Sequence, residues 1–261
     1  MTGHERRPDM HLTVLGAGTA VPSPRRSPAG YLLRVAGEPL LFDAGPGTLA
    51  RLAVAGVSHQ ELRRVFISHL HSDHVLDLVT LLQVSNATPG WTRAEPLELL
   101  GCRGLAELVR QVTAAFDGTV PEGFPLQITE LGEERREFAG GGGWMVETAL
   151  TGHTPGSLAF RVEAAGRTMV YSGDAVESEG LARLAREADT FVCECSFFRG
   201  WRTADHVTAD GAGRMAQAAG ARRLILSHLY PPAQEADVAG QARAEYEGEV
   251  VVAVDGTTVA V

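Results

Sequence analysis

The feature that most restricts the fold of this chain is a six-residue stretch in which four side chains are potential metal ligands. His69, His71, Asp73 and His74 all lie in the segment HLHSDH, directly after the apolar run 65–67 that predicts a buried strand. Imidazole and carboxylate groups are good ligands for zinc and similar metals. Two histidines two positions apart near a strand end project to the same side, and the other two donors follow at the start of a predicted helix. The stretch therefore offers enough donors for two ions, and a polar loop with chance histidines explains it poorly.

Three more potential ligands occupy similar settings later in the chain. Each lies in a short turn after an apolar run: His153 in GHTPG, Asp174 in YSGD and His228 in LSHL. Binding sites of α/β proteins gather outside strand ends. A single histidine in such a loop is more often structural, but three donors in one local setting, beside a cluster that still needs ligands, favour a shared metal site.

The apolar runs alternate between strand-like and helix-like spacing. Strands are predicted at residues 11–15, 31–35, 39–42, 65–67, 97–100, 124–130, 144–150, 159–163, 168–171, 190–193, 223–226, 249–254 and 257–261. Helices are predicted at residues 48–55, 73–84, 104–116, 178–188, 208–220 and 238–246. Hairpins are expected to turn at Gly37 and at Asp255-Gly256, and the glycine run 140–143 is expected to be a loop or hairpin tip. The economical arrangement is a layered α/β fold with helices outside and sheet inside.

Composition restricts the class of protein. Of the 261 residues, 44% are hydrophobic and 21% are charged, which supports a sizeable core and excludes disorder as the main state. No apolar stretch approaches the ~18 residues of a membrane span, and the polar N-terminus shows no secretory signal. The cysteines, Cys102, Cys193 and Cys195, form neither a disulfide framework nor a CxxC motif. A cytoplasmic protein with free thiols and no membrane association is expected.

These residues resemble the metallo-β-lactamase superfamily. The HxHxDH motif is residues 69–74, the preceding acidic motif is Asp43 in LFDAG, and His153, Asp174 and His228 follow in the order of the family. The resemblance covers nearly the whole chain. It implies an αββα sandwich, in which two mixed β-sheets are flanked by helices.

The resemblance also implies a domain organisation and a ligand set. We expect a single domain over residues 1–261, with residues 1–10 as a flexible terminus. One metal ion would be held by His69, His71 and His153, the other by Asp73, His74 and His228, with Asp174 bridging the two. Asp43 would hydrogen-bond near the ligands and help to orient a ligating histidine, although a helix N-cap or turn role is the alternative. Two divalent cations are the expected cofactors, zinc because the ligands are rich in nitrogen, with manganese or iron as alternatives.

Such a site predicts hydrolysis. Two metals hold a hydroxide nucleophile at neutral pH and stabilise the charge on the attacked group, so Asp73 counts among the catalytic residues as well as the ligands. The ligands do not determine which bond is cleaved, because members of the superfamily hydrolyse lactams, thioesters, lactones, sulfates and phosphodiesters.

Several segments are similar to the ribonuclease Z-like phosphodiesterases of the superfamily. These are LGAGTAVPS followed by Arg25 and Arg26, then LFDAGPGT, CECSF around Glu194, and HVT beginning at His206. In that group the histidine is proposed to protonate the leaving oxygen, with the glutamate supporting it, and an adjacent carboxylate keeps an imidazole charged. We therefore predict His206 as general acid and Glu194 as its orienting partner. A helix-terminal residue and a buried ion pair are the alternatives, and the two arginines either bind substrate phosphate or lie in a solvated loop.

The substrate is expected to be small. Ribonuclease Z enzymes that process transfer RNA carry a long flexible arm between the motifs that match His153 and Asp174, whereas this chain has room there for only two strands and a turn. The formal net charge of −9 also argues against a protein that coats nucleic acid. A cyclic nucleotide, a cyclic ribose phosphate or a short RNA is expected, with RNA the less favoured partner.

Other interpretations stay open. The segment GHTPGS at 152–157 also resembles thioester- and lactam-cleaving members, so a thioesterase, lactonase or lactamase on the same metals is the first alternative. A non-catalytic accessory protein of the same family is the second. The apolar face of residues 75–82 either forms a homodimer interface or belongs to the core. Trp91 and Trp201 either line a pocket or pack elsewhere.

Overall fold

The computed structural model describes residues 10–138 and 143–261. The predicted flexible terminus, apart from Met10, and the glycine run, apart from Gly143, lie outside the described residues. Met10 itself begins the first strand.

Two seven-stranded sheets pack against each other. In spatial order, the first sheet comprises β14 (Thr258–Ala260), β1 (Met10–Gly16), β2 (Gly30–Val35), β3 (Glu38–Phe42), β4 (Arg64–Ile67), β5 (Leu97–Gly101) and β6 (Leu126–Glu130). The second comprises β13 (Glu249–Val252), β12 (Arg223–Ser227), β11 (Thr190–Glu194), β10 (Arg167–Tyr171), β9 (Leu158–Ala164), β8 (Trp144–Leu150) and β7 (Arg135–Phe138). Strands β3–β6 run parallel in one sheet and β10–β13 in the other.

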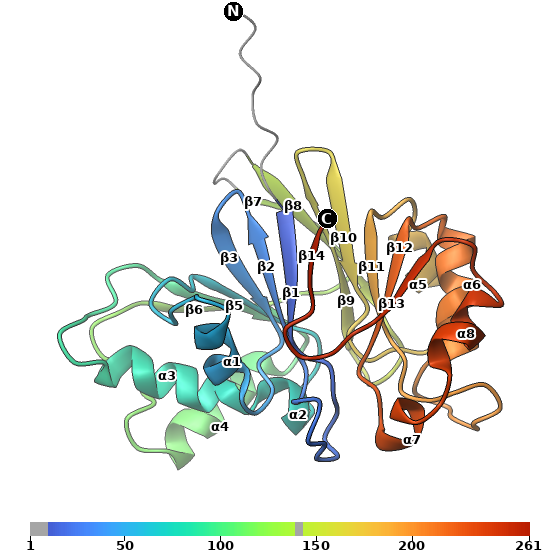
Figure 1. Ribbon diagram of the computed structural model, residues 1–261. Helices are drawn as coiled ribbons and strands as arrows, with labels where there is room; N and C mark the ends of the chain where they lie inside the picture. Colours follow the sequence, from blue (N-terminus) through green and yellow to red (C-terminus); the bar gives the residue numbers. More distant parts are fainter. Residues whose placement is uncertain (1–9, 139–142) are drawn as a thin grey trace, which may run out of the picture.

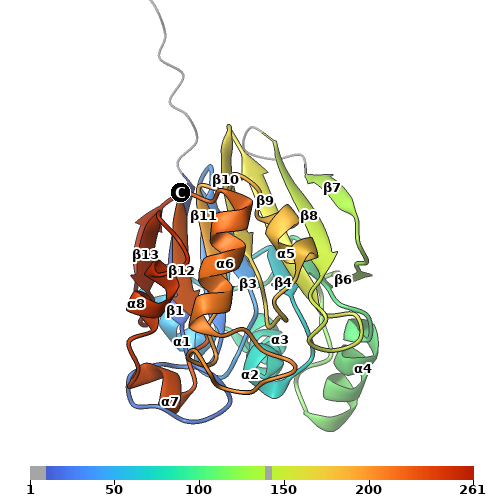
Figure 2. The ribbon, with the colours of Figure 1, turned by 90° about the vertical axis from the view of Figure 1, so that its right-hand side faces the viewer.

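Helices cover the outer faces of both sheets. The helices are α1 (Thr48–Val54), α2 (Ser72–Val75), α3 (Asp77–Ala87), α4 (Leu105–Ala115), α5 (Glu179–Leu184), α6 (Ala209–Ala219), α7 (Pro231–Gln234) and α8 (Val238–Arg243). Figure 1 shows α1, α3 and α4 on one side and α5, α6 and α8 on the other, and Figure 2 shows α5 and α6 lying over the second sheet. The expected αββα sandwich is confirmed.

Successive side chains along the strands point alternately into two separate hydrophobic cores. In β10, Met169 and Tyr171 face the core between the sheets, while Val170 faces the core beneath α5, α6 and α8. Successive side chains of a strand point to opposite faces. A strand covered on both faces therefore reads as a continuous apolar run, which is why β10 was recognisable in the sequence.

An aromatic cluster joins the two sheets. Phe42 of β3 stacks on Phe66 of β4 with ring centroids 4.8 Å apart, and Phe160 of β9 packs edge-on against both at 5.5 and 5.7 Å. All three side chains are fully buried. Aromatic pairs in this arrangement stabilise beyond their area burial, so the cluster holds the sheets at the spacing on which their common edge depends.

The single helix predicted at residues 73–84 is wrong: the chain forms two helices that break at Leu76. The amide of Ala44 donates to the carbonyl of His74 at 2.7 Å, and the amide of Asp77 donates to the carbonyl of Ala44 at 2.8 Å. These bonds to the loop after β3 replace helical bonds across the break. The apolar face proposed as core or interface is core, because Val75, Leu78, Leu81 and Leu82 are buried.

The predicted terminal hairpin at Asp255-Gly256 is also wrong, because the two strands join different sheets. β13 pairs with β12 in the second sheet, and β14 pairs with β1 in the first. The Asp255 carboxylate accepts hydrogen bonds from the amides of Ala17 at 3.1 Å and Ser27 at 2.8 Å. The turn is therefore anchored on β1 and on the loop that follows it, since the Gly256 amide also donates to the carbonyl of Val14 at 2.8 Å.

Smaller differences have local causes. β7 was not predicted because its charged residues hid the pattern of an edge strand. α7 was missed although Pro231 opens it, a position that suits proline. α5 ends earlier than predicted, before Glu187 takes a left-handed φ of 54°. Within the described part of the chain, no helix has the length and hydrophobicity needed to cross a bilayer.

The aromatic cluster generates a stability prediction. Phe160→Ala is expected to lower the free energy of unfolding by about 3–5 kcal/mol, because it removes a fully buried ring from between the sheets. Chemical denaturation measures the change. Phe116→Ala is the matched control: this ring is 51% exposed, so the loss should stay within about 0.5 kcal/mol. Equal losses for the two variants would contradict the assignment of the cluster.

Candidate metal centre

The predicted ligands lie together at one edge of the sandwich. His69 follows β4, His153 follows β8, Asp174 follows β10 and His228 follows β12. The carboxyl ends of these strands come from both sheets and meet at this edge, which is the lower edge in Figure 1, where α2 and α7 lie. The structure thereby brings all seven predicted ligands into two adjacent groups.

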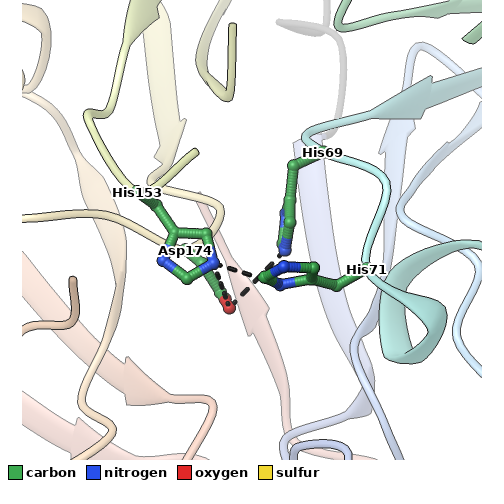
Figure 3. Close-up of side chains that lie close together, drawn as sticks. All are labelled: His69, His71, His153 and Asp174. Carbon is green, nitrogen blue, oxygen red and sulfur yellow. Dashed lines mark hydrogen bonds and ion pairs between the residues drawn. The ribbon is translucent and has the colours of Figure 1, made fainter. Parts of the chain in front are cut away.

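The first group consists of His69, His71, His153 and Asp174, which offer one atom each within 4.8 Å of one another. Figure 3 shows the three imidazoles and the carboxylate converging. Asp174 Oδ2 lies 3.7 Å from Nε2 of both His69 and His153, and His153 Nε2 lies 3.2 Å from His71 Nδ1. Three nitrogens and one oxygen form a donor set that suits zinc.

The second group consists of Asp73, His74 and His228. Nε2 of His74 and Nε2 of His228 lie 3.3 Å apart, and each lies 3.3 Å from Asp174 Oδ1. Asp73 Oδ2 lies 3.4 Å from His228 Nε2. Asp174 therefore presents one oxygen to each group, as a bridging carboxylate would.

On His74 and His153, the ring nitrogen that points away from the two ligand groups donates a hydrogen bond to an oxygen atom. His74 Nδ1 donates to Asp43 Oδ2 at 2.7 Å, and His153 Nδ1 donates to the backbone carbonyl of Asp205 at 2.7 Å. A proton on Nδ1 leaves the Nε2 lone pair directed into the centre, which is the tautomer a metal ligand needs.

His69 and His228 have the same arrangement with a serine as the acceptor. His69 Nδ1 lies 3.0 Å from Ser68 Oγ, and His228 Nδ1 lies 3.1 Å from Ser196 Oγ. Four of the five histidines among the predicted ligands therefore direct Nε2 into the centre. His71 instead directs Nδ1 there.

The donor atoms fit divalent cations. His69 Nε2 and Asp174 Oδ1 are buried and have no hydrogen-bond partner within the described ranges. In the tautomer that a metal ligand needs, with the proton on Nδ1 alone, Nε2 of His74 and Nε2 of His228 would place two lone pairs face to face across 3.3 Å. Lone pairs that face each other repel, and buried acceptors without a partner are costly. Cations coordinated by these atoms remove both costs.

Charge in the centre supports the same conclusion. Burial and the neighbouring His74 lower the pKa of His69 to about 2, so its imidazole is neutral. Burial opposes the ionisation of Asp174, but His228 and His74 hold its pKa well below the usual range. The pKa of His74 is raised well above its usual value in spite of its burial, because Asp174 and Asp43 face it. Without a cation, the carboxylates thus favour a second proton on His74, and a bound cation would supply the positive charge in its place.

Asp43 connects several elements around the centre. Its fully buried carboxylate accepts from the amide and hydroxyl of Ser68 at 2.8 and 2.7 Å, from His74 and from the Tyr171 hydroxyl at 2.6 Å. Its φ of 56° is left-handed, and strain of this kind at a non-glycine residue gathers at functional sites. The N-cap alternative does not apply to α1, whose N-cap is Gly47.

Two glycines let the backbone approach at the centre. A Cβ on Gly45 would lie 2.1 Å from the carbonyl oxygen of Asp73. Gly173, directly before Asp174, has a φ of 56°, and a Cβ there would lie 2.8 Å from Cβ of Ser68. Only glycine fits at these positions, which explains the glycines of the LFDAG and YSGD segments.

His206 adjoins both ligand groups and pairs with Glu194, as predicted from the sequence. Glu194 Oε1 accepts from His206 Nδ1 at 3.0 Å and from the Ala175 amide at 2.8 Å. Burial lowers the pKa of His206, but the hydrogen bond and charge of Glu194 outweigh it and raise the pKa to about 9. The His206 ring lies 4.8 Å from that of His153 and 5.9 Å from that of His228, between centroids.

An aromatic stack lies beside His206. Phe197 stacks on Trp201 with centroids 4.8 Å apart and on Tyr230 with centroids 5.1 Å apart. The Tyr230 ring lies 5.7 Å from that of His206, and Trp201 is 40% exposed. The stack therefore extends from the centre to the surface.

The other residues singled out in the sequence have structural contacts. Arg25 pairs at the surface with Glu235. Arg26 is buried, and its Nε donates to a backbone carbonyl near the end of the chain, so it supports the fold. The Trp91 ring packs under the guanidinium of Arg93.

Sequence reasoning missed three hydroxyl groups that contact the side chains of the predicted site residues, those of Ser68, Tyr171 and Ser196. Two of them stand in or next to motifs, since Ser68 directly precedes His69 and Ser196 lies in the CECSF segment. A hydroxyl beside a predicted site residue in a motif is the signal that could have identified them. Tyr171 lies far from its partner Asp43 in the sequence and carries no such signal.

Comparison with known proteins places the chain among metallo-hydrolase relatives. The sequence profile described as Metallo-beta-lactamase superfamily matches residues 24–228. A Mycobacterium bovis (strain BCG / Pasteur 1173P2) protein named Ribonuclease Z is 30% identical over 271 residues, which cover 94% of this chain and 96% of that protein.

Solved structures with the same fold cover almost the entire chain. The metallo-beta-lactamase fold protein YhfI from Bacillus subtilis has a TM-score of 0.83 at 24% identity, covering 98% of this chain and 100% of that one. The short form of human tRNase Z has a TM-score of 0.76 at 25% identity, covering 96% and 98%.

The geometry of the centre predicts its metal content. Wild-type protein should retain about two equivalents of zinc per chain after dialysis, and His153→Ala, which removes a ligand of the first group alone, about one. Asp174→Ala should weaken both positions, because its carboxylate faces both groups. Elemental analysis measures the content. His59→Ala is the control, since this histidine bonds to Thr88 outside the centre. Retention of both equivalents by Asp174→Ala would contradict the bridging position.

Proposed function

Because the chain belongs to the metallo-beta-lactamase superfamily, we propose that it is a metal-dependent hydrolase that cleaves phosphodiester bonds. The family match and the relative named Ribonuclease Z support the class of reaction. The observation that carries the choice of bond is the Glu194–His206 pair beside the seven donor atoms. Cleavage of a phosphodiester expels an alkoxide, which needs a proton, and the pair holds one at the edge of the centre.

The residues divide the work between binding and proton transfer. The two groups His69, His71, His153 and Asp73, His74, His228 would hold two divalent cations, with Asp174 between them. Bound divalent cations of this kind neutralise phosphoryl oxygens and lower the pKa of water. Zinc suits the nitrogen-rich set, and manganese or iron are alternatives.

His206 acts on the leaving group. Its Nδ1 is held by Glu194, so its Nε2 is the atom that can donate a proton to the leaving oxygen. Glu194 is itself fixed by the Ala175 amide and the Ser196 hydroxyl, at 2.8 and 2.6 Å. The glutamate therefore orients the imidazole and keeps it charged until the proton is transferred.

A small substrate suits the surroundings better than transfer RNA. Residues between His153 and Asp174 form only β9, β10 and the adjoining turns, with no long arm inserted. The net charge of −9 disfavours extensive contact with a polyanion. The stack of Trp201, Phe197 and Tyr230 offers an aromatic surface next to His206. Nucleobases stack on such surfaces, so a cyclic nucleotide is favoured over a cyclic ribose phosphate.

The role of His206 predicts a dependence on the leaving group. In metal-loaded protein, His206→Ala should lower kcat by about 10²–10⁴-fold on a cyclic nucleotide, whose alkoxide needs protonation. The loss should be much smaller on bis-p-nitrophenyl phosphate, because nitrophenolate leaves without a proton. Steady-state kinetics on the two substrates measure the split, with chelated protein as the blank. Equal losses on both substrates would contradict a general-acid role.

The bond cleaved is tested by the same assay. Turnover of bis-p-nitrophenyl phosphate that depends on zinc or manganese supports phosphodiester cleavage. Its absence, in protein shown to hold two metals, would transfer the function to a thioester, lactone or lactam substrate on the same centre. Absence of turnover on all of these substrates would indicate the accessory role.

The aromatic stack predicts a base-dependent KM. Stacking is worth about 1–3 kcal/mol per base, so Trp201→Ala should raise the KM for a cyclic nucleotide about fivefold or more. The KM for a cyclic ribose phosphate without a base should not change. A parallel comparison of the two substrates measures this, and unchanged KM values for both would contradict the stacking role.

A further inference from the structure

The two halves of the molecule hold their metal-facing histidines in the same way. In the first half, the hydroxyl of Ser68 donates to Asp43 Oδ2 at 2.7 Å and lies 3.0 Å from His69 Nδ1. In the second half, the hydroxyl of Ser196 donates to Glu194 Oε2 at 2.6 Å. Each half thus contains a hydrogen-bonded triplet of carboxylate, serine and histidine. The histidine of the second triplet is His228.

Every member of both triplets is shielded from water. Ser68 and Ser196 have no exposed surface, and the carboxylates of Asp43 and Glu194 belong to residues that are 0% and 2% exposed. The serine amides also bond to the same carboxylates, that of Ser68 at 2.8 Å and that of Ser196 at 3.3 Å. Each hydroxyl is therefore fixed at both its backbone and its side chain, and water is not at hand to replace it.

Counting donors assigns the protons. A serine hydroxyl carries one hydrogen, and in both triplets a carboxylate accepts that hydrogen at short range. The oxygen is then free only to accept, so the adjacent histidine must carry its proton on Nδ1. Ser196 Oγ also lies 3.2 Å from His206 Nδ1, but the single proton of that nitrogen goes to Glu194, which is closer and charged.

We infer that Ser68 and Ser196 are positioning residues, each of which sets the tautomer of one metal-binding histidine and through it the affinity of one metal position. This rests on the proposed metal sites. Ser68 acts on the position formed by His69, His71 and His153. Ser196 acts on the position formed by Asp73, His74 and His228, and it also ties that position to the carboxylate that orients His206.

The serine variants test the inference in pairs. Partners of ligating histidines typically contribute 10–100-fold to metal affinity, so Ser196→Ala should weaken one of two zinc-binding steps by about that factor and leave the other unchanged. Ser68→Ala should weaken the other step. Titration of the metal-free proteins with zinc against a chromophoric chelator measures both steps. Ser85→Ala is the matched control, a buried serine whose hydroxyl has no hydrogen-bond partner among the described residues, and both zinc-binding steps of this variant should match those of wild type.

A second readout separates positioning from general damage to the fold. Long-range proton–nitrogen spectra of the metal-free protein report which ring nitrogen carries the proton before zinc binds. The Nδ1–H signal of His228 should weaken in favour of Nε2–H in Ser196→Ala alone, and that of His69 should do so in Ser68→Ala alone. Ser196→Thr, which keeps a hydroxyl, should restore both the affinity and the signal, and it carries the test should the alanine variant not fold.

The outcomes are distinct. Wild-type affinity and unchanged signals in both alanine variants would overturn the inference and leave the hydrolase proposal intact. Equal weakening of both zinc-binding steps by either variant would also overturn it, because the two triplets would then not act on separate metal positions. Wild-type protein without zinc binding would overturn this inference together with the proposed function.

Discussion

The buried carboxylate of Asp174 is the constraint on which the rest of the site depends. It is 3% exposed and presents one oxygen to each of two sets of histidine nitrogens. A buried ionised group is costly unless it is paired, and the lone pairs around it repel one another. The fold must therefore hold these donors in place against their own repulsion. The aromatic contacts between the sheets and the close approaches at Gly45 and Gly173 do so, and divalent cations make the arrangement favourable.

Two further carboxylates, one in each half, organise the donors from outside. Asp43 holds His74 directly and His69 through a serine, so both of its histidines face the metal positions. Glu194 holds His228 through a serine in the same way, but the histidine that it contacts directly is His206, which lies outside the two ligand groups proposed here. The same construction thus yields two ligands in one half, and one ligand with a proton donor in the other.

The sequence was sufficient to predict the features that depend on a local pattern of residues, namely the candidate ligands and the buried strands. The HLHSDH stretch and the later turns after strands identified all seven residues that the structure brings together, and continuous apolar runs located strands covered on both faces. Contacts between distant segments were not predictable. The helix after His74 breaks because the loop after β3 captures its backbone, and the last two strands separate because Asp255 bonds to the loop after β1. Tyr171 reaches Asp43 only through the packing of two sheets.

The central claim is that two metal ions lie on either side of Asp174. Crystals of the zinc-loaded protein, measured at the zinc absorption edge, test it most directly. The account predicts two anomalous peaks, one among His69, His71 and His153 and the other among Asp73, His74 and His228, with the Asp174 carboxylate between them. A single peak, or peaks elsewhere in the molecule, would contradict it.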